Sequence, residues 1–329
     1  MIPRNLLKYN NKSRIITIGE LLVEFVPCNP DGKLSQPGEM IKTASGSSGI
    51  FASAVGKLGN ESGFIGQIGK DLLSQFVINV VKKQGVDTQH IKVVDEGKIG
   101  LSFVEYTESG RNFQYYRDNS VGSQLDEDGV DAEYISNSAI LHYPGMLLEL
   151  SQSMQRACIK AVKIAKENGV IVSFDPNIRK ELIQKDGAID RMKWAVAQAD
   201  ILSPTLEEAK FITGEEDISK IIRKLHAMGP KIIAITKDED GSIISCEDEC
   251  LDFSGYSIDV IDPTGAGDTF SAALLVGIMK EWDLKKIGKF ANAAGALVCK
   301  KQGTIGLAIP TYEDTIKWMN SNECSTEKI

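Results

Sequence analysis

The chain has 329 residues, of which 42% are hydrophobic and 25% charged, a composition that suits a globular protein with one large α/β domain. Its net charge of −8 argues against nucleic acid and anionic membrane surfaces as main partners. We expect a cytoplasmic protein with reduced cysteines, because no apolar run resembles a signal peptide or approaches the ~18 residues of a membrane span.

Apolar strands and amphipathic helices alternate along most of the chain. Short apolar runs predict buried strands at 15–19, 63–66, 139–143, 170–174, 201–203 and 231–236. Apolar residues at helical spacing predict helices at 50–58, 71–84, 151–168, 191–199, 206–213 and 218–228. This order predicts an α/β fold with a doubly wound, mostly parallel sheet and helices on both faces. In such sheets the functional residues gather at the carboxyl ends of the strands.

Two stretches interrupt the alternation and predict a small β appendage. Residues 21–42 contain two strand-like pieces with no helix between them, and residues 98–120 contain two more that flank a predicted hairpin turn at 108–111. The appendage would therefore be built from segments that are not contiguous in the chain. Residues 1–14 and 321–329 are predicted to be flexible tails.

A glycine-rich run at 262–270, with the sequence DPTGAGDTF, carries the strongest chemical signal. Alternating residues at 256–260 predict a strand before it, and a helix is predicted to begin at about Gly265. Gly265 and Gly267 leave the N–H groups of the first turn accessible, which makes an anion site. Asp268 places a carboxylate one turn inside this site, as transfer of a phosphoryl group to an alcohol would require. The alternative is an acidic first turn that only complements the helix dipole.

The run at 262–270 resembles the signature of the ribokinase-like sugar kinases, the phosphofructokinase B family. The resemblance to this family extends over residues of about 15–318. The resemblance implies a ribokinase-like kinase domain whose β appendage is a lid that closes over a sugar and forms a homodimer. It implies that Asp268 is the catalytic base and that the amides of Gly265, Ala266 and Gly267 form an anion hole. ATP and Mg²⁺ are the implied cofactors, and a monovalent cation such as K⁺ is a further candidate.

Three other segments match the family's sugar-binding motifs. Gly46 lies where glycines approach the sugar hydroxyls, although Ser45 replaces a glycine and Ile50 an asparagine of the family pattern. Tyr115 and Arg117 lie two apart, so they share one face of a strand, as in the aromatic-x-Arg strand of 2-keto-3-deoxygluconate kinases. The alternative for this pair is an ordinary amphipathic strand.

Asn177 and Arg179 belong to an Asp-x-Asn-x-Arg sequence found in both 2-keto-3-deoxygluconate kinases and fructokinases. Two arginines directed at one pocket, Arg117 and Arg179, would suit a carboxylate, which guanidinium binds bidentately. The predicted substrate is therefore 2-keto-3-deoxygluconate or a similar keto-sugar acid. A neutral ketose, fructose or tagatose, is the alternative, since the Ile-Phe-Ala sequence at 50–52 looks like that of ketose kinases.

The nucleotide and metal residues are assigned by the same resemblance. Glu208 falls where the family carries the glutamate that helps to hold Mg²⁺ through water, with Thr205 in the place of an asparagine. Predicted ATP contacts are Thr236, Gly241, Gly265, Gly267 and Asn292, with Asp238 where a glycine is common. Glu207 is expected to be a solvated helix residue, and Asn292 has the alternative of a partly buried helix polar residue.

Functions of two other classes are alternatives. A nucleotide-binding oxidoreductase would carry Gly-x-Gly-x-x-Gly directly after the first strand, but Gly19 leads into Glu20. A sugar-sensing protein without turnover would not need Asp268 and its glycines. A Walker A sequence is also absent, because Lys57 is followed by Leu58 rather than Ser or Thr.

Overall fold

The computed structural model describes residues 12–29, 31–107, 110–179, 183–246 and 249–329. An eleven-stranded sheet forms its centre, in the order β15-β14-β13-β12-β11-β10-β9-β1-β4-β5, with β6 also paired to β4. The strands are β1 (Ile15–Ile18), β4 (Ser62–Ile68), β5 (Val86–Asp87), β6 (Ile91–Val93), β9 (Ile140–Pro144), β10 (Ile171–Asp175), β11 (Ile201–Leu202), β12 (Ile232–Thr236), β13 (Ser242–Cys246), β14 (Glu249–Phe253) and β15 (Thr326–Lys328). Pairing is parallel from β12 to β5 and antiparallel from β12 to β15, which confirms the predicted doubly wound α/β fold.

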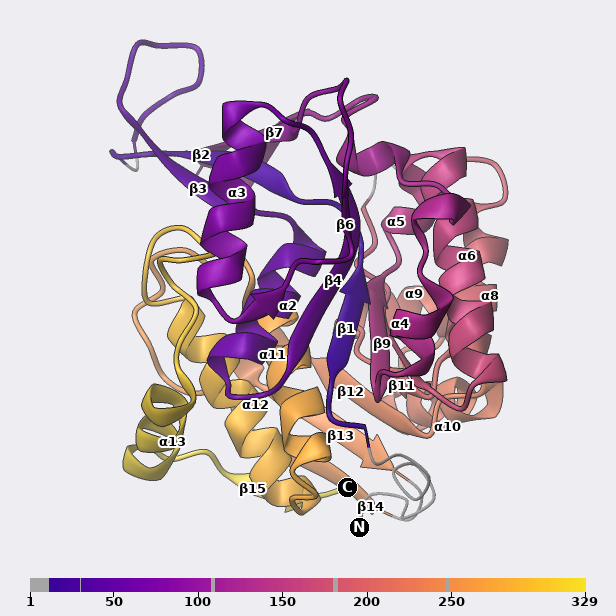
Figure 1. The fold of residues 1–329 in the computed structure, drawn as a ribbon. Helices are drawn as coiled ribbons and strands as arrows, with labels where there is room; N and C mark the ends of the chain where they lie inside the picture. Colours follow the sequence, from indigo (N-terminus) through magenta and orange to yellow (C-terminus); the bar gives the residue numbers. More distant parts are fainter. Residues whose placement is uncertain (1–11, 30, 108–109, 180–182, 247–248) are drawn as a thin grey trace.

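Helices cover both faces of the sheet, because neighbouring strand residues such as Ile15 and Ile16 enter two different apolar cores. One face packs against α2 (Ser47–Lys57), α3 (Leu72–Lys83), α11 (Ala266–Met279), α12 (Leu284–Val298) and α13 (Tyr312–Ser321). The other packs against α4 (Ala132–Ser136), α5 (Leu147–Leu150), α6 (Gln152–Glu167), α8 (Ala188–Gln198), α9 (Leu206–Thr213) and α10 (Ile218–Met228). Figure 1 shows the two helical layers on either side of the strands. Among the described residues, none of these helices is long and apolar enough to cross a membrane.

The predicted β appendage is a separate four-stranded sheet above the main one (Figure 1). Its strands are β3 (Met40–Ser45), β2 (Leu22–Pro27), β7 (Gly100–Thr107) and β8 (Gly110–Tyr116), in that spatial order. β2 pairs antiparallel with β3 and parallel with β7, and β7 pairs antiparallel with β8. We refer to this sheet as the lid. Two residues of the predicted hairpin turn, 108 and 109, lie outside the described residues.

Two predictions about the C-terminal third need correction. The segment 254–260, predicted to contain a strand, has no regular structure, and Val260 and Ile261 are both 58% exposed. The backbone N–H groups of Ile261 and Asp262 donate to the carbonyl of Cys299 at the end of α12, so this segment pairs with a helix terminus rather than with a strand. The alternation of apolar residues there does not reflect a pleat.

The expected C-terminal tail, 321–329, also differs from the prediction. Thr326–Lys328 forms the edge strand β15 against β14, and Cys324 is buried. The polar sequence misled the prediction because an edge strand needs only backbone hydrogen bonds and few buried side chains. Most of the N-terminal segment 1–14, also predicted to be a tail, lies outside the described residues.

Candidate active site

The first turn of α11 has the geometry expected of an anion site. Gly265 is the N-cap, with a φ of 81° in the left-handed region that favours glycine. An added Cβ at Gly265 would lie 2.9 Å from Cγ2 of Ile50, so this position has neither the conformation nor the space for another residue. No side chain caps the helix. The N–H of Ala266 donates a long hydrogen bond of 3.3 Å to the carbonyl oxygen of Pro263, which leaves the N–H groups of Gly265 and Gly267 as the ones available to a ligand. Ile50, which replaces an asparagine of the family pattern, therefore packs against the anion site.

A second helix N-terminus, that of α2, meets the first one. Its N-cap, Gly46, has a φ of 105°, and an added Cβ would lie 2.7 Å from the carbonyl oxygen of Glu20. The next residue, Ser47, donates a hydrogen bond of 2.5 Å from Oγ to Oδ1 of Asp268. Residues more than 200 positions apart in the sequence are thereby brought into one site.

Asp268 is a buried carboxylate whose protonation is opposed by its neighbours. Its side chain lies in the first turn of α11, and the residue is 8% exposed. Burial raises the pKa of Asp268 to about 6, while the hydrogen bond from Ser47 and the charge of Arg179 act in the opposite direction. At neutral pH the carboxylate is ionised and can accept a proton.

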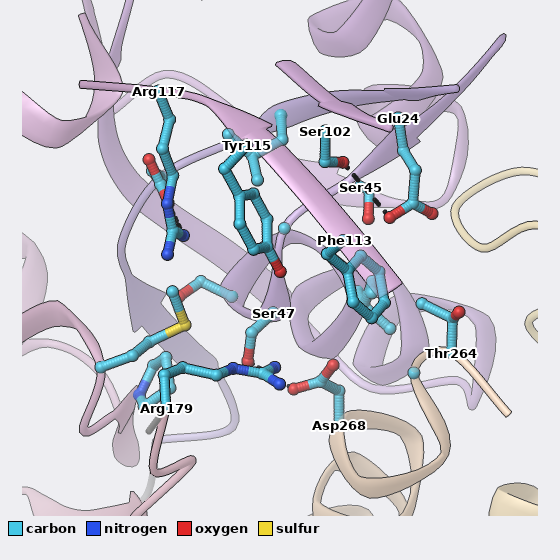
Figure 2. Close-up of a pocket in the computed structure, with 18 of the residues that line it drawn as sticks. Glu24, Ser45, Ser47, Ser102, Phe113, Tyr115, Arg117, Arg179, Thr264 and Asp268 are labelled. Atoms are coloured by element: carbon cyan, nitrogen blue, oxygen red, sulfur yellow. Dashed lines mark hydrogen bonds and ion pairs between the residues drawn. The ribbon is translucent and has the colours of Figure 1, made fainter. Parts of the chain in front are cut away.

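The carboxyl end of β10 supplies the next group of side chains. The backbone N–H of Asn177 donates to Oδ1 of Asp175 over 3.0 Å, and Nδ2 of Asn177 donates to Oγ of Ser47 over 3.2 Å. Arg179 points toward Asp268 in Figure 2, and its Nε is buried with no hydrogen-bond partner among the described residues. Burial, followed by the charges of Glu208 and Asp268, raises the pKa of Asp175 well above its usual range.

The lid covers the site from the opposite side (Figure 2). Tyr115 and Arg117 extend from β8 and its end toward Asp268 and Arg179, as the shared strand face predicts. The guanidinium of Arg117 lies 4.2 Å from the centre of the Tyr115 ring and donates a 2.9 Å hydrogen bond to Oε1 of Glu20. Both members of this ion pair are buried. Arg117 is thus already neutralised by an acidic partner.

Acidic and polar side chains that the motifs did not identify complete the cavity. Glu20 and Glu24 are each 3% exposed, and each has one carboxylate oxygen with no partner among the described residues. Burial and the charge of Asp262 raise the pKa of Glu24 to about 7, while hydrogen bonds with Ser102 and Ser45 and the charge of Arg111 act in the opposite direction. The position of Glu20, directly after β1, was a signal that could have identified it, because that strand also ends at the site. The cavity is lined by Glu20, Leu22, Glu24, Ser45, Gly46, Ser47, Ser48, Ile50, Ser102, Arg111, Phe113, Tyr115, Arg117, Pro144, Met146, Leu147, Arg179, Thr264, Gly265 and Asp268.

Glu208 lies behind this cavity rather than on its wall. Its two oxygens accept hydrogen bonds from the backbone N–H groups of Ile178, at 2.6 Å, and Thr205, at 2.9 Å. Thr205 and Glu208 form a capping box at the start of α9, which gives Thr205 a role of its own in place of the family asparagine. No group of three His, Cys, Asp or Glu side chains in the described part of the chain forms a direct metal site. The residues fit a cation held through water, because the carboxyl groups of Glu208 and Asp268 lie close enough to Asp175 to raise its pKa, and a cation there would relieve this repulsion.

The predicted nucleotide residues gather beside α12. Thr236 ends β12. Gly241 packs closely against Ser254, because a Cβ added at Gly241 would lie only 2.5 Å from the carbonyl carbon of Ser254. Nδ2 of Asn292 donates to the carbonyl oxygen of Ser254 at 3.5 Å. Asp238, in the place of a family glycine, has a φ of 49°, which is the left-handed conformation that glycine adopts more readily.

Comparison with known proteins places this arrangement in a family. The model of the pfkB family carbohydrate kinases matches residues 12–311. "Probable fructokinase-5" of Arabidopsis thaliana is 32% identical over 321 residues, which cover 94% of this chain and 98% of the relative. The crystal structure of a "putative Ribokinase II" of E. coli with ATP and Mg²⁺ is 28% identical and has a TM-score of 0.88. The match covers 94% of this chain and 99% of that one.

A 2-dehydro-3-deoxygluconokinase of Thermotoga maritima has the same fold, with a TM-score of 0.86 at 23% identity over 94% of this chain and 99% of that one. The relatives therefore include proteins named for two kinds of sugar. This chain and the two solved structures share the fold. The chain belongs to the pfkB family of carbohydrate kinases.

Proposed function

We propose that this protein transfers the γ-phosphoryl group of ATP to a hydroxyl of a neutral ketohexose such as fructose. The observation that carries the reaction type is the buried carboxylate of Asp268 beside the uncapped N-terminus of α11, within one cavity. The relative named as a fructokinase supports the ketose, and the E. coli relative crystallised with ATP and Mg²⁺ supports the phosphoryl donor.

In this mechanism Asp268 accepts the proton of the attacking hydroxyl, and its pKa of about 6 suits a base that works near neutral pH. The N–H groups of Gly265 and Gly267 stabilise the charge on the transferred phosphoryl group. Mg²⁺ would neutralise phosphate charge, and Glu208 would hold it through water. Thr236, Gly241 and Asn292 would contact the nucleotide.

The balance of charge in the cavity favours a neutral sugar over the sugar acid predicted from the arginines. Arg117 is paired with Glu20, and Arg111 donates a 3.1 Å hydrogen bond to the buried carboxylate of Asp262. Glu20 and Glu24 each have a buried carboxylate oxygen with no partner among the described residues, and sugar hydroxyls could donate to these oxygens. Gly46, Tyr115 and Asn177 would contact the same sugar.

2-Keto-3-deoxygluconate remains the second candidate because of Arg179. Its buried Nε has no hydrogen-bond partner among the described residues, so this guanidinium could still receive a carboxylate.

Turnover of fructose, tagatose, 2-keto-3-deoxygluconate and ribose with MgATP tests the substrate directly. We expect the highest kcat/KM for fructose. Arg179→Ala should cost a neutral ketose about one hydrogen bond, ~0.5–1.5 kcal/mol. For an acid paired with this arginine the cost should be ~2–5 kcal/mol, which appears as a higher KM. A wild-type preference for the acid, together with the larger loss on the acid, would contradict the neutral-sugar assignment.

We also propose that the lid forms a homodimer through its outer face. The rings of Phe25 and Phe103 stack there with their centres 4.9 Å apart, and Tyr116 packs edge-on against Phe103 at 5.6 Å. Tyr116 is 63% exposed, so a second copy could cover it.

Activation by a monovalent cation such as K⁺ stays a prediction, which assays with K⁺ replaced by tetramethylammonium would test.

A further inference from the structure

A continuous chain of hydrogen bonds reaches Asp268 through Ser47. Asn177 donates from Nδ2 to Oγ of Ser47, and Ser47 donates to Oδ1 of Asp268. A serine hydroxyl has a single proton. Because Ser47 accepts from Asn177, its own proton is directed to Asp268, and Figure 2 shows Ser47 beside that carboxylate. The three residues come from the start of α2, the loop after β10 and the start of α11.

The donor end of this chain is itself fixed. The backbone N–H of Asn177 donates to Asp175, the last residue of β10, and the φ of Asn177 is 41°. Asparagine tolerates this left-handed conformation better than most residues do. The amide of Asn177 is therefore held in place by the backbone, and it holds the hydroxyl of Ser47 in turn.

We propose that Ser47 is a positioning residue, which fixes Oδ1 of Asp268 so that Oδ2 is directed at the reacting sugar hydroxyl. The proposal rests on the proposed role of Asp268 as the base. A carboxylate without this bond could rotate about its terminal torsion, which is broad. Charge-assisted hydrogen bonds are the strong ones, and this bond is partly buried, so water competes with it less than at the surface.

The bond has a second consequence for the ionisation of Asp268. The charged groups that face Asp268 are Arg179, which favours its ionised form, and Asp175, whose own pKa is raised partly by Asp268. Ser47 acts in the same direction as Arg179. Loss of the hydroxyl should therefore raise the pKa of Asp268 further and leave less base at a given pH.

Ser47→Ala measures both effects, assayed on the sugar that the wild-type enzyme phosphorylates fastest. We expect kcat to fall roughly 10- to 100-fold, as for a lost hydrogen bond to a charged group, with little change in the KM of sugar or ATP. The acid limb of the kcat–pH profile should move to higher pH. Ser47→Thr keeps the hydroxyl and should restore most of the turnover.

Ser53→Ala is the matched control. Ser53 lies in the same helix, is fully buried, and its Oγ has no hydrogen-bond partner among the described residues. The same chemical change there should leave kcat and its pH profile at the wild-type values. Ser47→Cys, which keeps the size but donates weakly, provides a second variant if the alanine variant is unstable.

Several results would overturn the proposal. The proposal is wrong if Ser47→Ala has the kcat and the pH profile of the wild type. If Ser47→Ala is unstable, the same result in Ser47→Cys would overturn it. A rise in the sugar KM alone would make Ser47 a sugar contact. In an Asp268→Asn background, Ser47→Ala should have little additional effect, because the two residues act as a unit. Full turnover by Asp268→Asn alone would instead remove the base assignment, so the two failures are distinguishable.

Discussion

At the scale of single residues, the site depends on how burial and hydrogen bonding balance on Asp268. Burial favours the protonated form of the carboxylate, whereas Ser47 and Arg179 act in the opposite direction, and together they place the pKa of Asp268 at about 6. The base is thus ionised near neutral pH and still basic enough to accept a proton. If Asp268 is the base, kcat/KM should fall as the pH drops below about 6, because the protonated form cannot accept the hydroxyl proton.

Asp268→Asn should retain ATP binding and lose roughly 10²–10⁴-fold in kcat, the usual contribution of a positioned base. Steady-state kinetics on the fastest sugar, with ATP affinity from calorimetry, measures both quantities. A variant within a few-fold of the wild-type kcat would exclude Asp268 from this role.

Glu24 is a second buried acid, and it makes stability depend on pH. Its pKa is raised from 4.5 to about 7, so the folded protein binds the proton more tightly than the unfolded chain does. Stability is then lost as the pH rises from the unfolded pKa through the folded one. Glu24→Gln should stabilise the protein at pH 8 by up to about 3 kcal/mol and have little effect at pH 4.5. Equal changes in unfolding free energy at both pH values would contradict this.

At the scale of elements, two lid side chains join the lid to the turn that leads into α11. Arg111 on β8 donates to Asp262 and contacts Thr264, and the hydroxyl of Tyr106 on β7 donates to Asp262 over 3.2 Å. The pKa of Tyr106 is raised to about 12, mainly by burial, so its hydroxyl stays a donor. Asp262 also accepts from the N–H groups of Thr264 and Gly303. The lid and the anion site therefore share one buried carboxylate.

Arg111→Met should loosen this connection and disorder both partners. We expect faster hydrogen exchange in β7, β8 and residues 262–266, together with a lower kcat/KM for the sugar. Lys33→Met is the matched control, because Lys33 pairs with Glu105 at 3.7 Å on the lid surface, where such pairs contribute little. If exchange became faster only in the lid strands and stayed unchanged in residues 262–266, Arg111 would not couple the lid to the turn before α11.

At the scale of the whole molecule, the proposed homodimer would place a second copy against the outer face of the lid. If its outer face forms a homodimer, the wild-type protein should sediment as a dimer and Tyr116→Arg as a monomer, since a buried unpaired charge is costly. Phe211→Arg is the control, because Phe211 is also exposed, at 51%, but lies on α9 away from the lid. A monomeric wild type at assay concentration would contradict the dimer.

The sequence determined most of the architecture because its signals are local. Helical periodicity gave α9 and α10 at their observed bounds, and apolar runs gave β1, β4, β9, β10, β11 and β12 within a residue or two, whereas β5, β6, β13 and β14 were not predicted. Where the pairing was non-local, prediction was wrong. Residues 254–260 alternate but form no strand, and Ile261 and Asp262, which follow them, donate to Cys299 at the end of α12. Thr326–Lys328 is polar but pairs with β14.

For the site, the glycine-rich turn was visible in the sequence because Gly265 and Asp268 lie within one helical turn. The partners of these residues were decided only by the tertiary structure. Ser47 reaches Asp268 across 221 positions, Arg117 reaches Glu20 across 97, and Arg111 reaches Asp262 across 151. Charge neutralisation between such distant residues depends on which side chains the packed sheet and lid bring together. The type of chemistry could therefore be inferred from the sequence, but the charge balance on which we base the proposed neutral sugar could not.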